Sequence, residues 1–256
     1  MNSEFNAFHQ AENNFFCMVS FSKIDYGDLV SYATGVQASG LNPTYVNEIE
    51  EQFSEHVTRC QAFYNQRELP WTLAIPDYLY EKSIEVLLQK HLLELAWKET
   101  AMMALIDNIT TPVTHSPLSV KEMKGDLNIW SIPLIHGFES TPEVTKVYTI
   151  RHELASQSGA RIHHFSGFID DTVVCSLTLS LCNENARIDD VATIPAFQKK
   201  GYATQLMCEA LNFAKKLNVK KCFLGASENG LNIYKKIGFN ELFINHYYEQ
   251  QSDSLS

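Results

Sequence analysis

Residues 191–203 constrain the fold of this chain more than any other stretch of its sequence, V-A-T-I-P-A-F-Q-K-K-G-Y-A. The stretch begins with small and β-branched residues typical of a buried strand, which Pro195 ends because it has no N–H. After Gly201 a helix is predicted, since apolar residues recur at the spacing of one buried face: Ala203, Leu206, Met207, Ala210, Ala214 and Leu217. The start of a helix has unpaired backbone N–H groups and partial positive charge, to which Lys199 and Lys200 add. This arrangement predicts a site for phosphate or pyrophosphate.

Two motifs in this half of the chain resemble the GNAT N-acetyltransferase superfamily. Residues 198–203 fit the pattern Q/R-x-x-G-x-G/A after a strand ending in V-x-T-x-P. Residues 224–239, L-G-A-S-E-N-G-L-N-I-Y-K-K-I-G-F, are similar to the family's A-S-x-x-G-x-x-x-Y-x-x-x-G-F. The motifs occur in order, separated by one amphipathic helix and one strand. The resemblance implies an α+β GNAT fold, with a mixed, mostly antiparallel central sheet flanked by helices.

The GNAT acetyltransferase domain is expected over residues 127–256, after a linker at 111–126 that contains two prolines. Residues 1–110 are expected to form a smaller α/β lobe with no Q/R-x-x-G-x-G/A pattern. This lobe resembles the first lobe of tandem GNAT proteins, a degenerate copy that has lost its cofactor loop. An unrelated α+β cap is an equal alternative. In either case the lobe would wall one side of the acceptor site.

Local patterns predict individual elements within these boundaries. Strands are predicted at residues 15–20 and 127–133, and helices at residues 25–34 and 45–66. The polar residues 250–256 are predicted to be a frayed tail.

The resemblance implies that acetyl-CoA is the cosubstrate and indicates which residues hold it. In the family, the strand before the loop splays from its neighbour, and its main chain pairs with the pantetheine arm. The loop and helix start cradle the pyrophosphate, although the two lysine side chains could equally be solvated surface charges. Gln198 stands where the family often has Arg, and a glutamine supplies no charge to the phosphates. Ser227 stands where some relatives have an Asn that contacts the cofactor. The expected cofactor-binding residues are Val191, Ala192, Thr193, Gln198, Lys199, Lys200, Gly201, Tyr202, Ala203, Thr204 and Ser227.

Three residues are candidates for catalysis. Tyr234 occupies the family position whose hydroxyl protonates the leaving thiolate, and an ordinary tyrosine is protonated at neutral pH. Its alternative role is to pack the last helix or to position the substrate. Asp189 and Asp190 lie where many GNAT enzymes have a Glu general base. Adjacent residues in a strand point to opposite faces, so only one is expected to face the substrates. Two alternatives remain open. A water chain to a backbone carbonyl could act in place of a carboxylate base, or the two aspartates could be a solvated pair near a turn with no catalytic role.

The sequence therefore predicts an acyl-CoA-dependent N-acyltransferase, which transfers an acetyl group to a primary amine by direct attack in a ternary complex. Two alternatives remain. One is a non-catalytic acyl-CoA-binding or regulatory protein on the same fold, and the other is an interaction module whose first lobe recruits a partner. The acceptor and the oligomeric state stay open, and a homodimer is compatible with this interpretation.

Composition excludes several other classes. The net charge of −10 argues against a nucleic-acid surface. No apolar run is long enough to span a bilayer and the N-terminus lacks a signal pattern, so we expect a cytoplasmic protein without a membrane partner. The six cysteines form no C-x-x-C pair and no zinc-ligand spacing, which predicts reduced thiols and no metal. His163 and His164 suggest a metal or base site, but a solvated pair at a strand edge is the preferred interpretation.

Overall fold

The structure is a computed structural model that describes residues 2–110 and 116–250. The chain divides into two compact units, which we call the larger unit (residues 1–19 and 100–242) and the smaller unit (residues 20–99 and 243–256). The chain passes from one unit to the other within β5 (Leu93–Leu105) and within β11 (Asn240–Gln250). The predicted domain boundaries differ from these units at both ends of the chain. Residues 1–19 were predicted to belong to the first lobe but lie in the larger unit, and residues 243–256 were predicted to belong to the GNAT domain but lie in the smaller unit.

The larger unit is built on a mixed sheet. Its strands are the end of β5, β6 (Ser119–Met123), β7 (Ile162–Ile169), β8 (Thr172–Cys182), β9 (Asn185–Thr193) and β10 (Lys221–Ala226). Their order is β6-β7-β8-β9-β10-β5, and every neighbouring pair is antiparallel except β9 and β10. The prediction of a mixed, mostly antiparallel sheet flanked by helices is confirmed.

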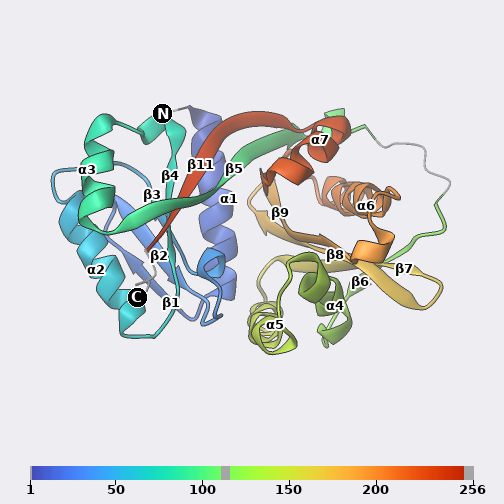
Figure 1. The fold of residues 1–256 in the computed structure, drawn as a ribbon. Coiled ribbons are helices and arrows are strands. Elements are labelled where there is room, and N and C mark those ends of the chain that lie inside the picture. The colour runs from blue at the N-terminus through green and yellow to red at the C-terminus, as the bar shows by residue number, and fades with distance from the viewer. Residues whose placement is uncertain (1, 111–115, 251–256) are drawn as a thin grey trace. The chain divides into compact units, whose positions relative to one another are not determined.

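Helices cover both faces of this sheet (Figure 1). α4 (Asn128–Gly137) and α5 (Pro142–Gln157) lie on one side together with α1 (Ser3–Val19), while α6 (Tyr202–Lys216) packs on the other. α7 (Glu228–Ile237) follows β10. Nearly every residue of β8 is buried because a central strand covered on both sides has no solvated face. Four residues of the predicted apolar stripe of α6, Leu206, Met207, Ala210 and Ala214, lie in the core, whereas Leu217, predicted to share that face, is exposed.

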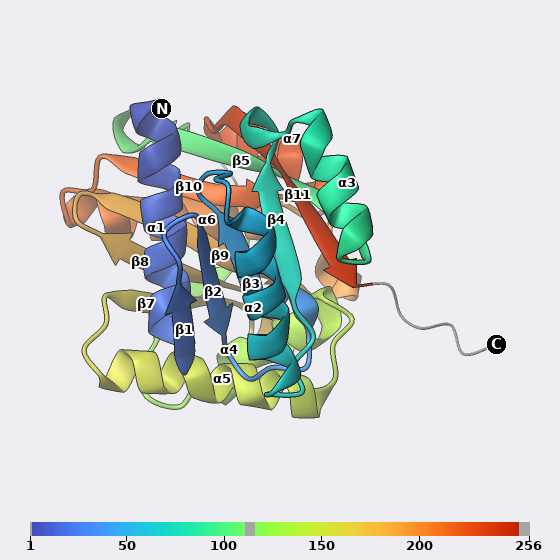
Figure 2. The same cartoon turned by 90° about the vertical axis from the view of Figure 1, so that its left-hand side faces the viewer.

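The smaller unit contains β1 (Ser22–Asp25), β2 (Leu29–Ala33), β3 (Pro43–Val46), β4 (Thr72–Pro76) and the end of β11, in the order β1-β2-β3-β4-β11. Figure 2 shows α2 (Phe53–Asn65) and α3 (Lys82–Lys90) on the side that faces the viewer. The strand pairs are antiparallel, antiparallel, parallel and antiparallel. The larger unit repeats this series along β7-β8-β9-β10-β5, again with a helix joining the two parallel strands.

Four of the elements predicted from local patterns are wrong in whole or in part. Residues 15–20 belong mostly to α1, residues 25–34 mostly form strands, and residues 45–66 contain the end of β3 before α2 begins. Residues 127–133 lie in and just before α4, not in a strand. The Asp126 carboxylate accepts from the Asn128 N–H (2.8 Å) and the Glu153 carboxylate from the Leu127 N–H (3.0 Å), which starts the helix despite its β-branched residues.

The predicted linker is only partly a linker. Residues 119–123 form the edge strand β6, whereas residues 111–115 lie outside the described residues. Most of the predicted tail, residues 251–256, also lies outside them. Within the described ranges, no helix is both long and apolar enough to cross a membrane.

Candidate active site

The pairing between β9 and β10 stops partway along both strands. Residues 185–187 pair with residues 221–223, but β9 continues to Thr193 and β10 to Ala226 with no further pairing between them in the described residues. The backbone edge of β9 over residues 188–193 that faces β10 therefore has no strand partner. Such an edge can accept hydrogen bonds from, and donate them to, an extended ligand.

A β-bulge explains why β9 leaves its neighbour. Ser176 of β8 pairs with Ala192, and Thr178 pairs with Asp189, so one residue of β8 lies opposite two residues of β9. Asp190 is one of these two, and its φ of 59° is in the left-handed region. An extra residue bends and twists the strand that carries it. The bulge thus ends the pairing with β10 and re-aims the Asp190 side chain.

The loop after β9 leads into a helix start that no side chain caps. The turn of 3₁₀ helix at Pro195–Phe197 is followed by Lys199 and Gly201, with φ values of 60° and 82°. Gly201 is the N-cap of α6 and has no side chain that could accept a capping hydrogen bond. The first helical hydrogen bond runs from the Gln205 N–H to the Gly201 carbonyl (3.0 Å). The N–H groups of residues 202–204 precede this bond, as at any helix start.

The surroundings of this helix start suit an anion. A Cβ built on Gly201 would meet nothing within 4 Å, so the space beside it is open. Lys199 and Lys200 are exposed, and the Lys200 ammonium lies 5.1 Å from the centre of the Phe197 ring. Gln198 instead turns back and donates from Nε2 to the Thr193 carbonyl (3.1 Å). The loop thus brings together open space, two lysines and the dipole of a 15-residue helix.

Asp189 and Asp190 do not point to opposite faces, and the expectation from strand alternation is wrong for them. Asp189 accepts both of its bonds from Nε of Arg187 (2.9 and 3.1 Å), and the Arg187 guanidinium also lies 3.4 Å from Glu12 of α1. Asp190 accepts from the Tyr148 hydroxyl of α5 (2.9 Å). Because α1 and α5 cover the same face, the bulge has placed two consecutive side chains on one side. Nor are they a solvated pair, since their side chains are only 14% and 9% exposed.

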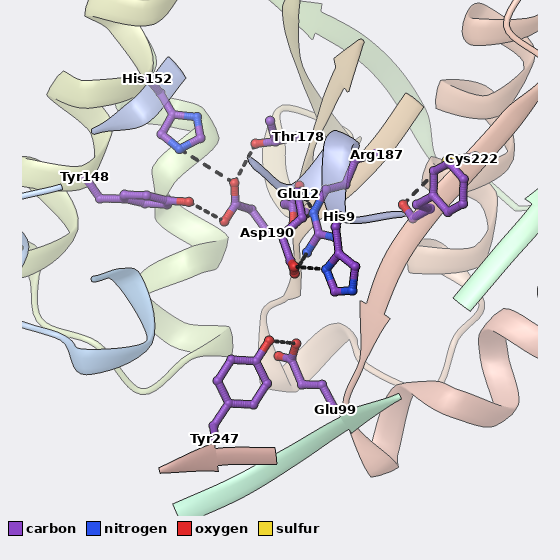
Figure 3. A network of polar contacts seen from close by, with 12 residues as sticks. His9, Glu12, Glu99, Tyr148, His152, Thr178, Arg187, Asp190, Cys222 and Tyr247 are labelled. Atoms are coloured by element: carbon purple, nitrogen blue, oxygen red, sulfur yellow. Dashed lines mark hydrogen bonds and ion pairs between the residues drawn. The ribbon is translucent and has the colours of Figure 1, made fainter. Parts of the chain in front are cut away.

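The two carboxyl groups differ in their partners. Burial raises the pKa of Asp189, and the charge of Arg187 opposes the rise. Asp190 has hydroxyl partners instead: Tyr148 on one oxygen and Thr178 (2.7 Å) on the other (Figure 3). Burial and the neighbouring charge of Asp189 raise the pKa of Asp190 to about 7, against these hydrogen bonds. Asp190 is therefore able to gain and lose a proton near neutral pH.

The sequence analysis missed Tyr148, Thr178 and His152. The signal for two of them lies in α5, whose buried face is unusually polar: Thr145, Tyr148, Thr149, His152 and Ala155. Its apolar residues Val147, Ile150 and Leu154 are exposed instead. A helix with polar residues at the spacing of its buried face directs hydrogen-bonding groups into the protein, which is a signature of a site.

The second motif forms β10 and α7 as predicted. A Cβ on Gly230 would lie 2.8 Å from Cε2 of the Tyr234 ring, so the tyrosine ring covers the glycine one turn earlier. Gly238 ends the helix with φ of 116°, and the ring of Phe239 lies 6.2 Å from that of Tyr234. Ser227 occupies the N-cap position of α7, but its side chain makes no capping hydrogen bond.

Neither histidine of the β7 pair is a simple solvated group. His164 is buried and lies 2.8 Å from His152, while His163 contacts Glu122 (2.8 Å). In the described residues no group of three or more His, Cys, Asp or Glu side chains could hold a metal ion. All six cysteines are free thiols, four of them buried.

A strand that leaves its parallel neighbour before a loop and an uncapped helix start is the arrangement expected from the resemblance to the GNAT superfamily. Residues 132–239 match the model of the family described as "Acetyltransferase (GNAT) family", and this part of the chain is a GNAT-family domain. A search of curated proteins finds no match.

Solved structures extend the likeness in fold beyond this domain. A GCN5-related N-acetyltransferase from Kribbella flavida has a TM-score of 0.75 at 10% identity, covering 100% of this chain and 98% of its own. A conserved protein of unknown function from Staphylococcus epidermidis gives 0.67 at 9% identity, covering 91% and 95%. A tandem GNAT protein from the clavulanic acid biosynthesis pathway gives 0.61 at 11% identity, covering 88% and 79%. These likenesses establish the fold.

Proposed function

We propose that this protein is an N-acyltransferase that uses acyl-CoA, with acetyl-CoA as donor and a primary amine as acceptor. The observation that carries the proposal is the end of β9–β10 pairing at Arg187 and Phe223, which leaves the rest of β9 without that partner before the loop to the uncapped start of α6. An extended thioester arm and a diphosphate need these two features side by side. The GNAT-family match over residues 132–239 supports the same reaction class.

In this proposal the donor lies along β9 and across the helix start. The pantetheine amides pair with the main chain of Val191, Ala192 and Thr193, which has no strand partner on the β10 side in the described chain. The diphosphate accepts from the N–H groups of residues 202–204, beside the open space at Gly201. Because Gln198 is uncharged and bonded to Thr193, Lys199 and Lys200 supply the positive charge.

Asp190 is the better candidate for the general base. Arg187 neutralises Asp189, whereas Asp190 is held by two hydroxyl groups and has a pKa of about 7. The amine gives a proton to the Asp190 carboxylate and its nitrogen attacks the thioester carbonyl carbon. The C–S bond then breaks, and the departing thiolate takes a proton from the Tyr234 hydroxyl.

The smaller unit fits a degenerate copy of the same fold without a donor site. It repeats the strand pairing of the larger unit, including the parallel pair joined by a helix. The segment between β3 and α2, residues 47–52, has no glycine and carries three exposed glutamates, Glu48, Glu50 and Glu51. Negative charge at a helix start repels phosphate, so we assign donor binding to the larger unit alone.

The test has two stages. Isothermal titration with CoA measures donor binding, and release of free thiol from acetyl-CoA with a library of amines measures transfer. Tyr234→Phe is expected to keep CoA affinity and to lower kcat about 100-fold. A wild-type protein that binds CoA but releases no thiol with any amine would favour a regulatory acyl-CoA-binding protein. Absence of CoA binding would refute the proposal.

A further inference from the structure

Two buried histidines lie in contact beneath the candidate base. His152 is on α5 and His164 on β7, and they are 0% and 2% exposed. His152 Nδ1 lies 2.8 Å from His164 Nε2, which is a hydrogen bond. Trp130 of α4 packs against both rings and anchors itself by donating from Nε1 to the Leu177 carbonyl (3.1 Å). The pair is thus held in one geometry by three elements of the larger unit.

Both rings are neutral. Burial lowers the pKa of His152 well below its ordinary value, and it lowers the pKa of His164 to about 3. A neutral imidazole carries a single N–H, so the 2.8 Å contact has one donor and one acceptor. Either His164 Nε2 donates to His152 Nδ1, or His152 Nδ1 donates to His164 Nε2. The first arrangement places the proton of His152 on Nε2, and the second leaves Nε2 as a bare lone pair.

Asp190 distinguishes these two arrangements. His152 Nε2 lies 3.8 Å from Oδ2 of Asp190, and it has no hydrogen-bond partner in the described residues. Figure 3 shows the imidazole facing the carboxylate. In the first arrangement an N–H faces a carboxylate oxygen across this distance. In the second, two lone pairs face each other inside the protein, which is unfavourable because they repel and neither can donate a proton to the other. Electrostatics favours the first arrangement.

We propose that His152 is a positioning residue for Asp190, held by His164 in the tautomer that carries its proton on Nε2 and directs it at the Asp190 carboxylate. The catalytic consequence rests on the proposed function, in which Asp190 is the base; the tautomer itself does not. Tyr148 and Thr178 donate hydrogen bonds to Asp190, and the array adds the N–H dipole of His152, which lies 3.8 Å from the carboxylate, beyond hydrogen-bond distance. The two hydrogen bonds and the dipole all favour the ionised carboxylate, so together they keep Asp190 able to accept a proton.

Other charged groups set the background for this effect. The titratable or charged side chains that surround Asp190 are Tyr148 and His152 of α5, His164 of β7, Asp189 and Arg187 of β9, and Glu12 of α1 beside Arg187. Replacing His152 disrupts the histidine pair and leaves the other charged groups around Asp190 in the sequence unchanged. His163 is a matched control, since it precedes His164 in β7 and contacts Glu122 and the Phe213 ring of α6 instead.

The first measurement uses the unaltered protein. Nitrogen NMR of the ¹⁵N-labelled histidines reports which ring nitrogen carries the proton, with His152→Gln and His164→Gln used for assignment. We expect His152 and His164 both to be protonated on Nε2 alone at neutral pH. A proton on His152 Nδ1, or a doubly protonated ring, would overturn the proposal. The reading requires neither an acceptor nor turnover.

The second measurement follows the Asp190 carboxyl by ¹³C NMR titration. His152→Phe, which removes the donor but keeps a ring, is expected to raise the pKa of Asp190 by about one unit. His152→Gln, which can donate from its amide, and His163→Gln should both leave it within about half a unit. An unchanged pKa in His152→Phe would contradict the proposal. Titration with CoA on the same samples keeps the two questions separate, because a failure to bind CoA refutes the proposed function without altering the tautomer.

Discussion

Replacing Gly201 by alanine should weaken CoA binding, whereas the matched change Gly159→Ala should cost similar stability and leave binding unchanged. Gly201 has φ of 82°, and a Cβ there would meet nothing within 4 Å, so alanine is strained only by the backbone. Gly159, at the end of α5, has the same φ of 82° and the same open surroundings. Each Gly→Ala change should therefore cost about 1–2 kcal/mol of stability. For a domain of this size that lowers Tm by about 2–8 °C in either variant.

The two variants should differ in binding because only Gly201 borders the proposed diphosphate site. A methyl group there fills the space from which the phosphate approaches the amides of residues 202–204. Loss of one hydrogen bond to a charged group costs about 1.5–3 kcal/mol. This corresponds to an increase in Kd of about 10-fold to 150-fold. Isothermal titration with CoA measures it, and Gly159→Ala should bind like the wild type. Equal affinity in both variants would refute the reasoning.

Three further predictions concern the catalytic groups. Asp190→Asn should lower kcat/KM about 100-fold, measured by thiol release. Because the pKa of Asp190 in the folded protein is raised from 3.8 to about 7, the stability of the wild type falls as pH rises through this window. Thermal melts of Asp190→Asn should therefore show a Tm that depends less on pH. The methyl group of Gly230→Ala should push against the Tyr234 ring and reduce turnover at least tenfold. Circular dichroism should show an intact or more stable α7, because alanine is favoured over glycine in helices by about 1 kcal/mol. Wild-type turnover in this variant would contradict the prediction. Glu12→Gln removes one of the two carboxylates beside Arg187 and should cost about 2 kcal/mol in urea unfolding, and a cost near zero would show that the ion pair contributes little.

The predictions that succeeded rest on backbone chemistry that is local in sequence. Pro195, Gly201 and the apolar spacing of residues 203–214 specify a strand, a turn and a helix without help from the rest of the chain. The same is true of the second motif, where Gly238 ends α7 in a left-handed conformation. The elements from the end of β9 to α7 follow from these signals, whereas the α+β class was implied by the resemblance to the GNAT superfamily.

The errors arose where packing between distant segments decides the structure. In α1 the buried residues follow a helical period from Phe8 to Val19, but residues 15–20 were predicted to be a strand because a short apolar run also fits a strand. α4 carries exposed isoleucines and an internal Pro133, which disfavour a helix locally, and packing of Trp130 against β8 outweighs them.

The bulge at Asp190 is the feature of the site that the sequence hides most completely. Alternation along a strand assumes regular pairing, and a single inserted residue reverses the outcome for Asp189 and Asp190. His164 was misassigned for a related reason. It was expected to be solvated at the edge of a strand, yet α4 and α5 bury it. The polar buried face of α5 was the sequence signal for their partners Tyr148 and His152.

A crystal structure of the protein with CoA bound tests the central claim most directly. The account predicts the diphosphate within hydrogen-bond distance of the amides of residues 202–204, with the pantetheine arm alongside the backbone of residues 191–193. Density for CoA at any other place on the chain, with the edge of β9 left uncovered, would contradict it.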